Sequence, residues 1–259
     1  MTTRQRRALT AVGEQAPALW LAVAGLLAWE AIVPLTGLSV FVLPRPSQIL
    51  ARMMSEYRLL TLHAAVTAAE VVAGFLLAAA VGIPTAFAIF YSRVFERALY
   101  PLLVALQTIP KVALAPLLIL WLGYDWKPKI FLGFVIAFFP IVIATVVGLQ
   151  ALDRSMVHLV RSMGASEWQT FVKLRLPAAL PNIFGGLKVG IALAVIGAVI
   201  GEYVAAERGL GYLQLSANAK FDTVLNFAAL VTISLLGVVL FWAIGLVEER
   251  VVFRREAAR

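Results

Sequence analysis

The chain has 259 residues, of which 62% are hydrophobic and 14% charged, and it contains no cysteine. A soluble domain has about 45–50% apolar and about 25% charged residues. This composition, with a mean hydropathy of +0.92, therefore excludes an ordinary soluble enzyme and a disordered chain. The formal net charge is +8, and we test it first as a topology signal because Lys and Arg bias the orientation of membrane helices.

Six apolar stretches are long enough to cross a bilayer, for which about 20 apolar residues are needed. Their ranges are 17–37, 64–90, 98–122, 129–149, 180–205 and 224–247. The sequence thus predicts an all-α integral membrane protein with six transmembrane helices. The predicted organisation is an N-terminal tail at 1–16, a membrane domain at 17–247 with its core at about 60–247, and a basic tail at 248–259.

The first stretch follows three arginines, as the apolar part of a signal peptide does. Its length of about 20 residues exceeds the usual range of about 7–15, and no small-x-small cleavage site follows it, so a retained span is predicted. With the N-terminus inside, 13 of the 22 Lys and Arg residues fall in inner segments and 7 in outer segments. This bias predicts that both termini are cytoplasmic.

Residues 48–60, in the first outer loop, predict a short amphipathic helix. Its apolar residues recur at helical spacing and are Ile49, Leu50, Met53, Met54, Tyr57 and Leu60. Such a helix either lies in the membrane interface or packs on the bundle of spans, and the sequence leaves both open.

Charged residues within the spans need an explanation, because each costs at least ~2.5–3.5 kcal/mol on insertion scales. They are Glu30, Glu70, Lys111, Lys188 and Glu202. Lys111 lies in a stretch broken by Pro110 and Pro116, and prolines at membrane depth free carbonyl groups that can line a cavity.

Gln107, Thr108 and Lys111 are therefore candidates for the translocation pathway, with Glu202 as a fourth. The alternative for Lys111 is an interhelical ion pair with either Glu202 or Glu70. Glu202 could also simply occupy an ordinary position near the membrane interface.

The fifth span carries one more charge and a ridge of small residues. Lys188 is expected to extend toward the cytoplasmic surface rather than to contact a solute. The ridge comprises Gly186, Gly190, Ala194, Gly197, Ala198, Gly201 and Ala205. Small residues let helices approach closely in lipid, so the ridge indicates either plain packing or a face that slides during transport.

The inner loop at 150–181 is the longest polar segment on the predicted cytoplasmic side. Its pattern predicts a helix over about 154–163 that stops at Gly164, since glycine accepts positive φ. A second helix begins at Ser166, which forms an S-x-x-Q capping box with Gln169, and we expect it to end at Leu176-Pro177.

The loop leaves several apolar side chains without a core of their own, namely Leu159, Met163, Trp168 and Phe171. Exposed apolar groups beside charges suggest a docking surface for a soluble partner. A loop folded back on the membrane surface fits the pattern equally well.

The segments Val160-Arg161-Ser162-Met163-Gly164-Ala165-Ser166 and Leu176-Pro177-Ala178-Ala179-Leu180-Pro181 resemble the cytoplasmic "EAA" loop of ABC importer permeases. Gly164 matches the glycine of that motif, and Leu176-Pro177 matches its Leu-Pro. His158-Leu159-Val160 departs from the acidic-Ala-Ala triplet, so the contacts of the first loop helix are less defined by the resemblance.

The resemblance covers about 43–247. Within the family, the chain is most similar to the branch that imports nitrate, sulfonates, taurine and related solutes. The matching segments are Leu43–Ser47, Ile109–Leu117, Trp121–Gly123, Phe139–Pro140, Gly201–Tyr203 and Gly209–Tyr212. It implies a MetI-like permease in a bacterial plasma (inner) membrane, with no catalytic residues of its own.

The resemblance also implies the partners. They are a second permease subunit in a homodimer, a cytoplasmic ATPase dimer that uses ATP and Mg²⁺, and an extracytoplasmic solute-binding protein. The implied ATPase-coupling loop is about 154–175. The candidate coupling residues, in this loop and in the Leu-Pro motif after it, are His158, Leu159, Val160, Arg161, Met163, Gly164, Ala165, Ser166, Trp168, Leu176 and Pro177.

Other functions lack their signals in this sequence. There is no G-x-x-x-x-G-K-[ST] motif for nucleotide phosphates, and His63 and His158 lack metal-ligand spacing. The positive charges already have a topological explanation, so no nucleic-acid partner is expected. A stand-alone secondary transporter is the alternative, although the halves of the chain show no internal repeat. The sequence does not identify the solute.

Overall fold

The computed structural model describes residues 3–256, and in that range the chain forms helices and no strands. The ends of the two predicted tails, 1–2 and 257–259, lie outside the described residues. In chain order the helices are α1 (Thr3–Leu35), α2 (Pro46–Ser55), α3 (Tyr57–Tyr91), α4 (Arg93–Gln107), the 3₁₀ turn η1 (Lys111–Leu114), α5 (Ala115–Leu122), α6 (Trp126–Gln150), α7 (Arg154–Ser162), α8 (Glu167–Thr170), the π-turn η2 (Phe171–Arg175), α9 (Leu176–Ala205), α10 (Leu210–Ala219) and α11 (Thr223–Glu256). The prediction of an all-α protein is confirmed.

Within the described residues, four helices are long and apolar enough to cross a membrane: α3, α6, α11 and the continuous helix Glu167–Val204. The pair α4 and η1–α5 passes the same test only when the two parts count as one span, and Trp20–Leu35 in α1 is a shorter apolar helix. These elements are compatible with the six predicted spans.

The third predicted span, at 98–122, is not one continuous helix. The helix stops at Gln107, and the chain bends by 90° before it continues as η1 and α5. Pro110 causes the break, because a proline disfavours helix at the residue before it and lacks an N–H for the helical ladder. Pro116 then occupies the first turn of α5, where no N–H is needed.

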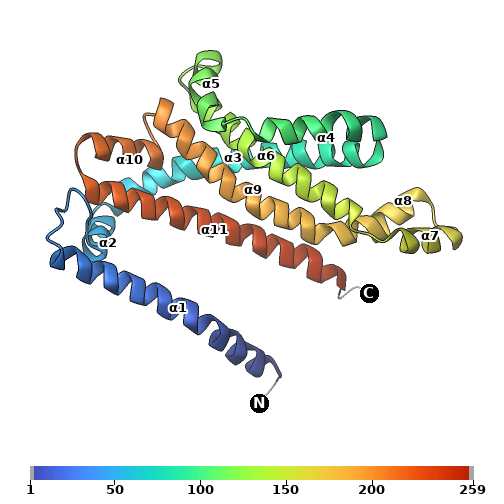
Figure 1. Cartoon of the computed structure of the whole chain (residues 1–259), viewed down its shortest axis with the longest axis horizontal. Helices are drawn as coiled ribbons and strands as arrows, with labels where there is room; N and C mark the ends of the chain where they lie inside the picture. Colours follow the sequence, from blue (N-terminus) through green and yellow to red (C-terminus); the bar gives the residue numbers. More distant parts are fainter. Residues whose placement is uncertain (1–2, 257–259) are drawn as a thin grey trace.

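The core of the bundle lies where α3, α6 and α9 cross, and α11 covers α9 (Figure 1). Buried residues from the three helices meet there: Val71, Phe75, Ala78, Ala137, Ile141, Ile191, Ala194, Val195 and Ala198. Four of the predicted small residues lie against the backbone or side chains of α6, namely Gly186, Gly190, Gly197 and Gly201. The small-residue ridge of the fifth span thus packs directly on α6.

The amphipathic helix α2 packs on the bundle, as one of the two alternatives expects. Ile49 is buried in a cluster with Leu60, Leu210 and residues of α11. Arg52 also forms a 2.6 Å ion pair with Asp222, which precedes α11. The helix ends at Ser55 instead of 60, and Leu50 and Met54 stay exposed.

Helices α7 and α8 lie at one end of the bundle, and α2 and α10 lie at the other (Figure 1). Helix α1 begins and α11 ends toward the same end as α7 and α8. The arrangement separates two groups of candidate residues, one in the loop at 151–175 and one near α10.

Candidate functional site

The loop at 151–175 contains the two short helices that its sequence pattern predicts. Helix α7 is capped by Asp153, whose carboxylate accepts a hydrogen bond from the Ser155 N–H at 3.0 Å; this bond lowers the pKa of Asp153. The break is at Gly164, with φ of +86°. Ser166 and Gln169 form the predicted capping box, with hydrogen bonds of 3.0 and 3.2 Å.

An ion pair and aromatic contacts hold this loop in one shape. Arg161 on α7 pairs with Glu167 on α8 across the glycine break. Phe171 packs edge-on against Phe87, with ring centroids 5.7 Å apart, and against Tyr91 of α3. The loop is thus in contact with the end of α3.

The second loop helix does not end at Leu176-Pro177, and that prediction is wrong. Helix α8 passes through the π-turn η2 directly into α9. The turn is wider than an α-helical turn, because the Leu176 N–H bonds back to the Phe171 carbonyl five residues earlier. It accommodates the next residue, Pro177, which lacks an N–H. The loop and the fifth span therefore form one continuous helix from Glu167 to Val204.

Most of the predicted loop-site residues are exposed. Leu159, Met163 and Trp168 expose 61%, 79% and 71% of their surface. His158, Arg161, Gly164 and Ser166 are also exposed, while Val160, Ala165, Leu176 and Pro177 are half-buried. The structure brings the exposed residues together on one short projection, with Val157 buried beneath it.

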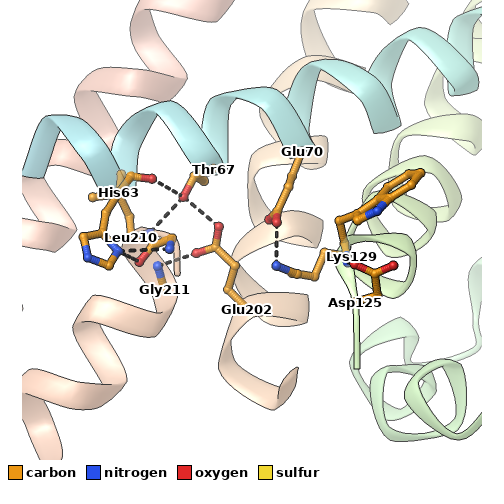
Figure 2. Close-up of polar contacts among 10 residues, drawn as sticks. His63, Thr67, Glu70, Asp125, Lys129, Glu202, Leu210 and Gly211 are labelled. Carbon is orange, nitrogen blue, oxygen red and sulfur yellow. Dashed lines mark hydrogen bonds and ion pairs between the residues drawn. The ribbon is translucent and has the colours of Figure 1, made fainter. Parts of the chain in front are cut away.

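Glu202 lies at the opposite end of α9 and is buried, with 1% of its surface exposed. Its carboxylate accepts hydrogen bonds from the Thr67 hydroxyl at 2.6 Å and the Gly211 N–H at 2.5 Å. The Thr67 hydroxyl oxygen in turn accepts from the Leu210 N–H at 2.8 Å (Figure 2). Glu202 therefore joins α9, α3 and the start of α10.

A buried ion pair lies beside this network. Lys129 on α6 places its Nζ 2.5 Å from Oε1 of Glu70 on α3 (Figure 2). Glu70 is one of the charges expected within the spans, whereas its pairing with Lys129 is not among the expectations. The signal was available, because the predicted topology places both residues near the outer ends of their spans.

The other predicted pathway residues lie away from Glu202. Gln107 and Thr108 are exposed at the 90° bend, and the Lys111 ammonium donates to the Gln107 carbonyl at 3.1 Å. It also lies 5.2 Å from the centroid of the Phe139 ring. The alternative that Lys111 pairs with Glu202 or Glu70 is wrong, because Glu70 pairs with Lys129 and Glu202 is held by Thr67 and Gly211.

Comparison with known proteins gives this architecture a family. Residues 74–253, which include the loop, α9 and Glu202, match the family model of the binding-protein-dependent transport system inner membrane component. The chain belongs to this family. It is an ABC transporter permease, a membrane subunit of a transporter.

Similar permeases cover almost the whole chain. The riboflavin transport system permease protein RibX of Chloroflexus aurantiacus is 39% identical, over 93% of this chain and 92% of the relative. The formylaminopyrimidine transport permease protein ThiX of Halalkalibacterium halodurans is also 39% identical, over 86% and 90%. The putative aliphatic sulfonates transport permease protein SsuC of Escherichia coli is 32% identical, over 84% of each.

The permease also shares its fold with a solved transporter. An inward-facing structure of the MetNI methionine ABC transporter matches with a TM-score of 0.62 at 21% identity. The match covers 77% of this chain and 97% of that one. The MetI-like fold expected from the sequence is thereby confirmed.

Replacing Glu202 with alanine is expected to free the 206–209 segment of the permease. The change leaves the buried Gly211 N–H without its acceptor, which costs about 1–3 kcal/mol. Trypsin should then cleave faster after Arg208, which is exposed, in the purified permease. Glu96→Ala, at an exposed position on α4, is the control, and equal cleavage rates in the two variants would contradict the role of Glu202 in holding this segment.

Proposed function

We propose that the permease is the membrane-spanning subunit of an ATP-driven importer for a small solute. Two copies pair, a cytoplasmic ATPase dimer binds the 154–175 loop, and an extracytoplasmic binding protein delivers the solute. ATP and Mg²⁺ are used by the ATPase partner and not by this chain. Both termini are cytoplasmic in the inner membrane, in agreement with the Lys and Arg bias.

The observation that supports this proposal is the exposed apolar surface of the loop. Leu159, Met163 and Trp168 remain exposed, although the Arg161–Glu167 pair and the contacts of Phe171 fix the loop that carries them. An ordered, exposed apolar surface with a charged rim is typical of a protein–protein contact. A loop folded on the membrane would instead need these side chains to face lipid.

The continuous helix suggests how the ATPase acts on the transport pathway. Glu167–Val204 has 38 residues, so it is about 57 Å long at 1.5 Å per residue. A displacement of the loop therefore moves α9 along its packing surface with α6, and Glu202 with it. The ATPase drives this change only if it binds the two states with different affinity.

The solute is a small molecule, and the pathway includes the outer end of α9. The similar permeases are named for riboflavin, formylaminopyrimidine and aliphatic sulfonates. Gln107 and Thr108 contribute exposed polar groups at the 90° bend, and Lys111 is half-buried beside them. Glu202 orders the 206–211 segment at the opposite end of the bundle from 151–175. A stand-alone secondary transporter is not favoured, because the family is that of binding-protein-dependent systems.

The test is association with the ATPase subunit in membranes. The double variant Leu159→Glu/Met163→Glu places two charges on the exposed surface and should reduce co-purified ATPase at least tenfold, because a buried unpaired charge is costly. Met54→Glu, at a position 71% exposed on α2, is the matched control. Undiminished co-purification with the double variant would contradict the docking role.

A further inference from the structure

Two carboxyl groups and one ammonium group are buried together at the end of the bundle opposite the 151–175 loop (Figure 2). Glu70 on α3, Lys129 on α6 and Glu202 on α9 expose only 5%, 7% and 1% of their residue surfaces. Lys129 places its Nζ 2.5 Å from Glu70 Oε1. In the part of the chain that the structure describes, Glu202 has no cationic partner.

The charges of this group do not cancel when both carboxyls are ionised. Two carboxylates and one ammonium leave one negative charge in excess, because the Lys129 ammonium can neutralise only one of them. An uncompensated buried charge is costly, since the interior of a protein solvates it far less well than water does. One proton on either carboxyl group makes the three residues neutral together.

The hydrogen bonds of the two carboxyl groups show where that proton is needed. Glu202 accepts from the Thr67 hydroxyl and from the Gly211 N–H. Glu70 Oε1 contacts Lys129, whereas Glu70 Oε2 is closed to solvent and has no hydrogen-bond donor among the described residues. The Glu70 and Glu202 carboxyl groups are hydrogen-bonding neighbours. A carboxylate only accepts hydrogen bonds and a carboxylic acid also donates one, so a bond between them requires a proton.

We propose that Glu70 and Glu202 form a binding site for one proton, which is held between their carboxyl groups. The proton supplies the missing hydrogen bond of Glu70 Oε2 and leaves one negative charge to face the Lys129 ammonium. Adjacent carboxyl groups share a proton because two like charges at this distance cannot both be ionised. A cavity of about 700 Å³ borders Glu70 and Lys129, and water in it connects the pair to the solution.

The bound proton stabilises the 206–211 segment, which Glu202 holds through the Gly211 N–H. Without the proton, repulsion from Glu70 would act on the Glu202 carboxylate and weaken this bond. The proton is present at low pH and is lost as the pH rises, so the segment should loosen at alkaline pH and not at acidic pH. The other titratable or charged groups around the pair are His63 of α3, Lys129 of α6, Tyr203 of α9, Tyr212 of α10, and Asp125, Glu207 and Arg208 of the adjoining loops.

Infrared difference spectra of the purified permease test the proposal, because the C=O stretch of a protonated carboxyl group is separate from the bands of a carboxylate. A maltoside detergent, which has no carbonyl group, leaves this region clear. At neutral pH, Glu70→Gln and Glu202→Gln should each abolish the band of the wild type, since Lys129 neutralises the carboxylate that remains. Lys129→Met should instead increase the band about twofold, because both carboxyls then lack a counter-charge. Glu96→Gln, at an exposed position on α4, is the control and should leave the band unchanged.

Trypsin cleavage after Arg208 gives a second readout. Between neutral and alkaline pH, the cleavage rate of the wild type should rise at least ~3-fold more than that of Glu70→Gln, which has no shared proton to lose. Thermal unfolding shows whether each variant is folded. No protonated-carboxyl band in the wild type, a band that both glutamine variants retain, or equal pH dependence of cleavage in the wild type and Glu70→Gln would overturn the proposal. Neither readout involves the ATPase, so the result leaves the proposed function to its own test.

Discussion

Replacing Gly164 with proline is expected to abolish association with the ATPase while leaving membrane insertion intact. Gly164 has φ of +86°, whereas proline fixes φ near −65°. The Gly164 N–H also donates to the Arg161 carbonyl at 2.9 Å, and proline has no N–H. The turn that brings α7 and α8 together would therefore open, and the Arg161–Glu167 pair across it would be lost.

The measurement is the amount of ATPase that co-purifies with a tagged permease, with the membrane fraction probed separately for insertion. Gly164→Ala keeps the N–H but adds a Cβ in the left-handed region, at a cost of about 1–2 kcal/mol, so it should give an intermediate loss. Gly185→Ala is the matched control, because no atom lies within 4 Å of the added Cβ. Wild-type association in the proline variant would show that the loop shape does not matter for docking.

Replacing Gly197 with alanine is expected to destabilise the permease strongly for such a small change. The added Cβ would lie 2.7 Å from the Gly133 Cα and 2.9 Å from the Leu132 carbonyl oxygen. Both are backbone atoms of α6, so neither can move aside as a flexible side chain would. Helices α6 and α9 must separate, and overpacking of this kind costs about 1–3 kcal/mol.

Thermal unfolding in detergent measures this effect, and a loss of about 5 °C is expected from the size dependence of the midpoint. Gly185→Ala again provides the comparison, since Gly185 lies on the same helix in open space. It should leave the midpoint unchanged or raise it, because alanine favours helix over glycine by about 1 kcal/mol. Equal midpoints for the two variants would contradict close packing of α9 on α6.

The loop at 151–175 could be predicted in detail because its structure depends on neighbouring residues. The stop at Gly164 and the capping box of Ser166 with Gln169 are local, and the structure contains both. The site roles assigned to this loop remain predictions. The end at Pro177 was predicted wrongly, because a π-turn a few residues earlier lets the helix continue past the proline.

The residues near α10 were harder to predict, since their partners are distant in sequence. Glu202 accepts from Thr67, 135 residues away, and Lys129 pairs with Glu70 from another span. Each residue alone was visible as a charge in or near a span. Only the packing of α3, α6 and α9 decides which charges meet.

The sequence by itself determined that the chain is a bundle of membrane helices, and which loop carries the two short helices. Both follow from apolar length and from capping, which act within a few turns of helix. The tertiary structure decided the site of α2 on the bundle and the partners of Glu70 and Glu202. The physical reason is that these features depend on contacts between distant segments, whose free energy is set by packing and not by local periodicity.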